Sequence, residues 1–117
     1  MKNVSANNIK QFKNKRVFLD GSKRSVIIID KLAIGYGKYK PGWKWSKHAG
    51  SQTEKKSAYH LGYIVSGKMV IKDRDGKKNT VGPNTVFEVA PGHDGWVAGK
   101  KPCVALDFYY KKGKINR

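Results

Sequence analysis

The sequence contains a single cysteine, Cys103, so no disulfide can form within the chain. A domain that folds without disulfides suits a reducing compartment, and we expect a cytoplasmic protein. No apolar run follows Met1-Lys2, so no signal peptide is predicted. No stretch approaches the roughly 18 apolar residues of a membrane span, so we expect no membrane partner. Neither a Gly-rich nucleotide loop nor a hydrolase nucleophile motif is present.

Acidic residues are also scarce, with 8 Asp and Glu against 25 Lys and Arg, for a formal net charge of +17. The basic residues fall in short blocks scattered along the chain, mostly at predicted turns and termini. A nucleic-acid interface is expected to show one basic stripe with interleaved aromatics, so the scatter favours a solvated surface. Weak, non-specific attraction to polyanions is expected either way, and nucleic-acid binding remains one alternative function.

A chain of 117 residues is long enough for one domain, which buries roughly two thirds of its surface on folding. Residues 1–15 are polar and rich in Asn, and we expect a flexible N-terminal arm. Residues 16–117 are then predicted to form a single domain.

β-Branched and aromatic runs separated by Gly, Pro and Asp predict many short strands, and no helical periodicity is present. Asp75-Gly76 is the two-residue turn that hairpins favour, and residues 46–57 predict a loop. The run from Val26 to Ile29 is apolar on both faces, which would be hazardous at an exposed edge and therefore predicts a homodimer contact. The strand candidates are residues 16–19, 25–29, 32–36, 59–65, 68–72, 77–81, 85–89, 96–98 and 104–110.

Two segments carry the motifs of a small β-barrel. His60-Leu61-Gly62-Tyr63-Ile64-Val65-Ser66-Gly67 indicates a strand that ends in a Gly turn, and Pro91-Gly92-His93-Asp94-Gly95-Trp96 follows after a hairpin. With Pro41-Gly42-Trp43-Lys44-Trp45-Ser46, they resemble the motifs of the cupin family, in the branch with Pro-Gly-His-Asp-x-Trp. The resemblance covers roughly residues 41 to 110. It implies an all-β, cupin-like antiparallel β-barrel (a double-stranded β-helix or jelly roll), and cupins commonly dimerise.

The resemblance also implies where metal ligands should lie, and the chain departs from that pattern. His60 stands where the cupin first motif usually has its inward Glu, and alternation puts it on one face with Gly62 and Ile64. The usual His pair would fall near 53–56, where the chain has none, and His93 comes two residues early. The metal-ligand candidates are therefore His60 and His93, with His48 less favoured among Lys44 and Lys47. Such a set would suit zinc, iron, nickel, copper or manganese.

The same residues could instead hydrogen-bond an organic ligand in a cavity lined by aromatics. The ligand-binding candidates are Trp43, Trp45, His60, His93, Asp94 and Trp96, with Asp94 able to orient His93 or to serve as a further ligand. Core packing is the competing explanation for each Trp, and an interior hydrogen bond is the competing explanation for each His. Cys103 has no neighbouring base and is expected to be a small buried side chain.

Three functions follow from these observations. The first is a ligand-binding cupin without catalysis, favoured because the metal set is incomplete. The second is a metal-dependent enzyme of the oxygenase, isomerase or lyase type, using His60 and His93. The third is a nucleic-acid-binding protein, suggested only by the charge.

Overall fold

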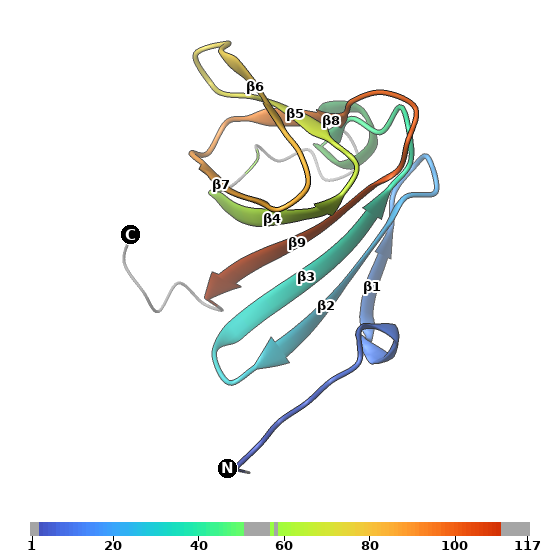
Figure 1. Cartoon of the computed structure of the whole chain (residues 1–117), viewed down its shortest axis with the longest axis vertical. Helices are drawn as coiled ribbons and strands as arrows, with labels where there is room; N and C mark the ends of the chain where they lie inside the picture. Colours follow the sequence, from blue (N-terminus) through green and yellow to red (C-terminus); the bar gives the residue numbers. More distant parts are fainter. Residues whose placement is uncertain (1–2, 51–56, 58, 111–117) are drawn as a thin grey trace.

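The computed structural model describes residues 3–50, 57 and 59–110, which form two antiparallel sheets (Figure 1). The larger sheet has the strand order β1-β2-β3-β9-β4-β7 and the smaller the order β6-β5-β8. The predicted all-β fold is confirmed. The strands are β1 (Asn14–Val17), β2 (Lys23–Ile29), β3 (Leu32–Tyr39), β4 (His60–Ser66), β5 (Met69–Lys72), β6 (Lys78–Val81), β7 (Thr85–Val89), β8 (Asp94–Val97) and β9 (Cys103–Tyr110).

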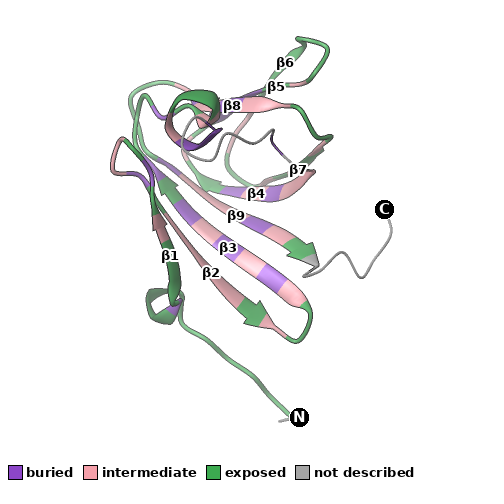
Figure 2. Ribbon diagram, turned by 180° about the vertical axis from the view of Figure 1, so that it is seen from behind, coloured by how far each residue is buried: buried purple, intermediate pink, exposed green. Residues whose placement is uncertain are grey.

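The hydrophobic core lies between the two sheets, where alternate residues of each strand face inward. Figure 2 shows this alternation as bands along β3, β9 and β4. Buried side chains from both sheets and from the connecting segments meet there, and they include Phe18, Tyr39, Trp43, Ala49, Ile64, Met69, Ile71, Val97 and Cys103. On one side, the segment that follows β3 is linked to β8 by a backbone bridge between Lys44 and Trp96. On the other side, the edges of β6 and β7 are not paired with each other in the described part of the chain.

The hairpin between β5 and β6 follows its predicted chemistry. Gly76 adopts a φ of 89°, a left-handed conformation that glycine accepts without strain. The carboxylate of Asp73 accepts hydrogen bonds from the backbone N–H groups of Asp75 and Lys77, at 2.9 and 3.0 Å. Asp73 and Asp75 are therefore turn residues, because their side chains and backbone close the hairpin.

Two segments contain regular elements that the sequence does not predict. Within the predicted arm, a short 3-10 helix, η1 (Ile9–Gln11), is capped by the Asn8 side chain, and Phe12 is only 5% exposed. β1 also begins inside that range. A single π-helical turn, η2 (Ser46–Gly50), occupies the start of the predicted loop, whose residues 51–56 lie outside the described part of the chain.

β2 is an interior strand, so the apolar run from Val26 to Ile29 does not lie at an exposed sheet edge. It pairs with β1 on one side and with β3 on the other. Ile27 and Ile29 point to one face of the sheet while Val26 and Ile28 point to the other. No described helix is long and apolar enough to cross a membrane.

Candidate functional site

His60 opens β4 and lies on the inner face of the large sheet. Alternation places it with Gly62 and with Ile64, whose side chain is fully buried, as the sequence predicts. Its ring stacks on Phe87 of β7, with centroids 5.9 Å apart and planes inclined by 21°. Burial lowers the pKa of His60 below 6.5; the charge of Asp107 opposes this effect, and His93 adds to it. The imidazole is therefore neutral at pH 7.

His93 comes from the turn that precedes β8, and its ring centroid lies 5.9 Å from that of His60. Its Nδ1 is 3.1 Å from the carbonyl oxygen of Ala90, which can only accept, so the neutral ring carries its proton on Nδ1. The Ser57 hydroxyl lies 3.2 Å from the same nitrogen and donates to the His93 carbonyl at 2.6 Å. Nε2 therefore carries the lone pair of the neutral ring, and burial lowers the pKa of this ring as well.

An ion pair that the sequence analysis did not identify lies beside His60. Arg24 Nε and Nη2 donate to the two carboxylate oxygens of Asp107, at 2.9 and 2.5 Å, across the intervening strand β3. The Asp107 side chain is 7% exposed and that of Arg24 is 23% exposed. Burial disfavours the charged guanidinium, but the hydrogen bonds and the charge of Asp107 outweigh it and raise the pKa of Arg24.

Glycines on both neighbouring strands make room for this pair. Gly35 and Gly62 are the direct cross-strand partners of Asp107. A Cβ on Gly35 would come within 2.6 Å of Arg24 Nη2, and a Cβ on Gly62 would collide with the Phe87 ring. The glycines therefore let a guanidinium and a ring lie flat on the sheet. A signal for Asp107 exists in the sequence, since it is the one charged residue in the run Val104–Tyr110 and alternates with Cys103 and Ala105.

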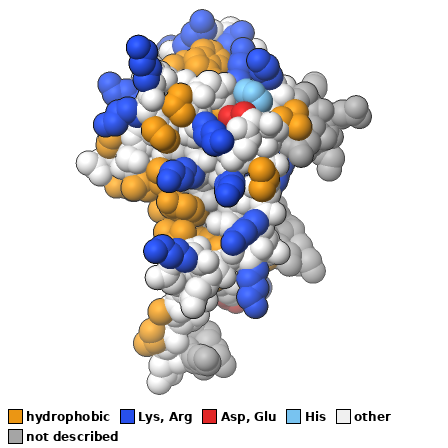
Figure 3. All heavy atoms as spheres, turned by 90° about the vertical axis from the view of Figure 1, so that its right-hand side faces the viewer, with side chains coloured by type: hydrophobic (Ala, Val, Ile, Leu, Met, Phe, Trp, Pro, Cys, Tyr) orange, Lys and Arg blue, Asp and Glu red, His pale blue; other side chains and the backbone are white. Residues whose placement is uncertain are grey.

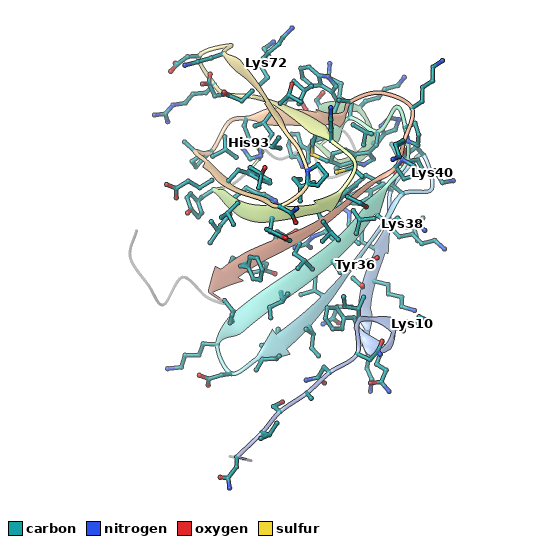
Figure 4. All side chains as sticks on the ribbon, in the orientation of Figure 1. Lys10, Tyr36, Lys38, Lys40, Lys72 and His93 are labelled. Atoms are coloured by element: carbon teal, nitrogen blue, oxygen red, sulfur yellow. The ribbon has the colours of Figure 1, made fainter. Side chains whose placement is uncertain are left out.

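Beyond Phe87, the space between the unpaired edges of β6 and β7 is a groove of about 520 Å³. Ile71, Val81 and Val89 line it together with Phe87, and Asp73, Arg74 and Glu88 contribute polar groups. This volume falls within the range of small-molecule sites. Phe87 lies between the groove and the His60 ring, and neither His60 nor His93 lines the groove. Figure 4 shows His93 in the space between the two sheets.

Three of the other candidates lie elsewhere. Trp43 is in the core, with its ring centroid 4.5 Å from that of Tyr39, and its buried Nε1 has no hydrogen-bond partner. Asp94 and Trp96 alternate with buried Gly95 and Val97, so they point to the outer face of β8. The Asp94 carboxylate accepts from the N–H and the hydroxyl of Ser46, at 3.0 and 2.7 Å, and does not orient His93.

Trp45 and Cys103 are better explained by packing in the interior than by ligand binding or reactivity. Trp45 packs partly buried against the core, and its ring lies where a Cβ on Gly50 would be. Cys103 is a fully buried free thiol whose pKa burial raises to about 11, so it is neutral and unreactive at pH 7.

His48 is not brought to the other imidazoles. It lies on η2, where its Nδ1 accepts the backbone N–H of Lys44 at 3.0 Å. Within the described residues, no group of three His, Cys, Asp or Glu side chains could hold a metal ion. His60 and His93 alone fall short of the three protein ligands of a typical catalytic zinc site. The described donors therefore do not complete the metal set that the resemblance implies.

No protein-family model matches the chain, and no curated protein matches it. Solved structures do match. A cupin-superfamily sugar phosphate isomerase from Silicibacter pomeroyi has a TM-score of 0.67 at 12% identity, over 92% of this chain and 82% of that one. A cupin-like protein from Thermotoga maritima has 0.66 at 14%, over 91% and 83%. A protein of unknown function from Vibrio parahaemolyticus has 0.63 at 19%, over 85% and 98%. At these identities the likeness concerns the fold alone, and the fold of this chain is cupin-like.

Proposed function

We propose that the protein binds a small organic ligand between its two sheets, beside His60 and His93. The observation that carries this proposal is the pair of neutral imidazoles, 5.9 Å apart, on an inner face that also holds the Arg24–Asp107 pair. Small-molecule sites combine apolar walls with a few convergent polar groups. Here Phe87 supplies an apolar wall beside His60, and His93 Nε2 supplies an acceptor of fixed tautomer.

The chemistry of the site favours a polar ligand that carries both donors and acceptors. Neutral imidazoles neither attract nor repel charge strongly, and Asp107 balances the charge of Arg24. A ligand hydroxyl could donate to His93 Nε2, and the flat surfaces of Phe87 and His60 could pack against its carbon skeleton. A densely charged anion would gain little here, because Arg24 is already paired with Asp107, and Arg16, its cross-strand partner on the same face, donates to the carbonyl of Ala49.

Screening with defined probes tests the proposal. The probes are a neutral sugar, a sugar acid, a sugar phosphate, a dicarboxylate and an aromatic amide, and the readout is the shift in melting temperature. A binding probe should stabilise the wild type and the matched control His48→Ala, but neither His60→Ala nor His93→Ala. A probe that stabilises all four proteins equally would show that binding occurs elsewhere. Stabilisation by none of the five classes would count against the proposal.

A metal-dependent enzyme is the second candidate, favoured by the same 5.9 Å separation of the two imidazoles. His93 Nδ1–H bonded to the carbonyl of Ala90 is the arrangement by which proteins orient a ligating imidazole. The cation would be a divalent transition metal, and a metal bound to these two side chains would need further ligands from solvent or substrate. Elemental analysis after dialysis against each metal separates this candidate from the first.

A further inference from the structure

The outer face of the small sheet carries an aromatic side chain on its edge strand β8. Trp96 lies on this face because its strand neighbours Gly95 and Val97 face the core. Its direct partner on β5 is Val70, and the partner of Val70 on β6 is Thr80. Trp96 is only half-buried and belongs neither to the core nor to the site around His60.

Two ammonium groups from distant parts of the chain lie over the Trp96 ring. Lys44 Nζ is 5.1 Å and Lys78 Nζ is 5.7 Å from the ring centroid. Lys44 is held there by its backbone bridge to Trp96, and Lys78 begins β6. Each is within the roughly 6 Å range of a cation–π contact, so both charges are held over the ring.

The same face keeps an excess of positive charge. Lys72 is directly opposite Lys78, and like charges placed opposite each other destabilise a sheet. Figure 4 shows Lys72 pointing away from the barrel. The carboxylate on this face, Asp94, is the partner of Lys72 on β8. It accepts a hydrogen bond from Ser46 and lies 3.9 Å from Lys44 Nζ, a distance at which an exposed pair contributes little, so three ammonium groups share one carboxylate.

We propose that this surface, formed by Trp96 with Lys44, Lys72 and Lys78, binds single-stranded nucleic acid. A base would stack on the Trp96 ring by displacing an ammonium group that lies over it, and the displaced lysines would contact the neighbouring phosphates. Stacked aromatics set among basic residues are the usual basis of such binding. Figure 3 shows basic side chains spread over one face of the molecule with few acidic ones, so the wider surface would also attract a polyanion.

The first experiment measures the affinity for a labelled oligothymidylate by fluorescence anisotropy at several salt concentrations. The wild type should bind with a log K against log salt slope of about −2, since each phosphate contact on a single strand contributes about −0.7. Each of Lys44→Gln, Lys72→Gln and Lys78→Gln should reduce the slope by about 0.7. Trp96→Leu should weaken binding about tenfold with the slope unchanged, whereas Trp96→Phe should keep most of the wild-type affinity.

The matched control removes the same charge from the large sheet, in the triple variant Lys15→Gln, Lys23→Gln, Lys38→Gln. It should keep the wild-type slope, whereas the triple variant of Lys44, Lys72 and Lys78 should lose it. Circular dichroism and melting temperature verify folding of every variant. His60→Ala should leave oligonucleotide binding intact, so this proposal can fail or stand independently of ligand binding between the sheets.

Heparin, a DNA duplex and anionic lipid vesicles serve as the alternative partners. The proposal predicts that oligothymidylate binds more tightly than all three at equal salt. It is overturned if heparin binds equally well and Trp96→Leu has no effect, because charge alone would then explain binding. Binding to vesicles or duplex but not to the single strand would also overturn it, as would equal losses in the two triple variants.

Discussion

The guanidinium of Arg24 and the carboxylate of Asp107 are joined by two hydrogen bonds on the inner face of the large sheet, across glycine-bearing β3. Removing one partner of a buried ion pair leaves the other charge without compensation, which costs about 3 kcal/mol or more. We therefore predict that Asp107→Ala lowers the free energy of unfolding by about that amount in urea denaturation.

The control for this prediction is the double variant Arg24→Met, Asp107→Leu, which removes both charges. Its free energy of unfolding should be closer to the wild-type value than that of Asp107→Ala, because no charge is left uncompensated. A wild-type urea midpoint for Asp107→Ala would show that the pair contributes nothing to stability.

The two histidines should make stability depend on pH. Burial lowers the pKa of His60 and of His93 in the folded state, so below 6.5 the unfolded chain binds more protons than the folded one. The contribution of the two neutral histidines to the free energy of unfolding is therefore fully present above pH 6.5, and it should be lost as the pH drops below that value. Urea midpoints measured at pH 7.5 and 5.5 check this, and His60→Gln should reduce the difference.

Metal content should depend on the inner histidines if the second candidate function holds. His60→Ala and His93→Ala should each remove stoichiometric metal, because only these two imidazoles lie together. His48→Ala should change it little, since that ring accepts the N–H of Lys44 on η2. Asp94→Asn should also leave it unchanged. Mass spectrometry of dialysed protein provides the measurement, and a metal-free wild type would eliminate the metal-dependent enzyme.

We also predict a homodimer. We expect the contact to form through the outer face of the large sheet, because β2 is an interior strand and offers no free edge. Outward-facing positions on an open antiparallel sheet are usually polar, but here two cross-strand rows are almost wholly apolar. One row runs Ile27, Ile34, Phe108, Leu61 and ends at Glu88; the other begins at Ser25 and continues through Tyr36, Leu106, Tyr63 and Val86.

Sedimentation at working concentration should give twice the chain mass of 13.1 kDa. Ile34→Lys and Phe108→Lys should each shift the protein to monomer, because an ammonium in an apolar contact loses its hydration. Leu19→Lys, at a turn position that is 64% exposed, is the control and should remain dimeric. A wild type that sediments as a monomer would contradict the prediction.

The sequence alone determined the fold class and most of the strands. Alternation is a local property of the backbone, so it also put His60 on one face with Gly62 and Ile64 before any tertiary contact was known. The Asp75-Gly76 hairpin was predictable for the same reason, because its conformation depends on adjacent residues. Local signals were weakest where burial decides the structure, as at Phe12 and at the η2 turn.

Only the tertiary structure decided which distant side chains meet. His60 and His93 were expected to share a cavity, but Arg24 and Asp107 were missed, because an ion pair between strands depends on register and sheet order. Asp94 and Trp96 follow His93 directly in sequence yet face away from it, since β8 begins at Asp94 and strand alternation turns successive side chains to opposite faces. Lys44 and Lys78 lie over Trp96 because folding brings separate segments of the chain together, and so gathers charges that are far apart in the sequence.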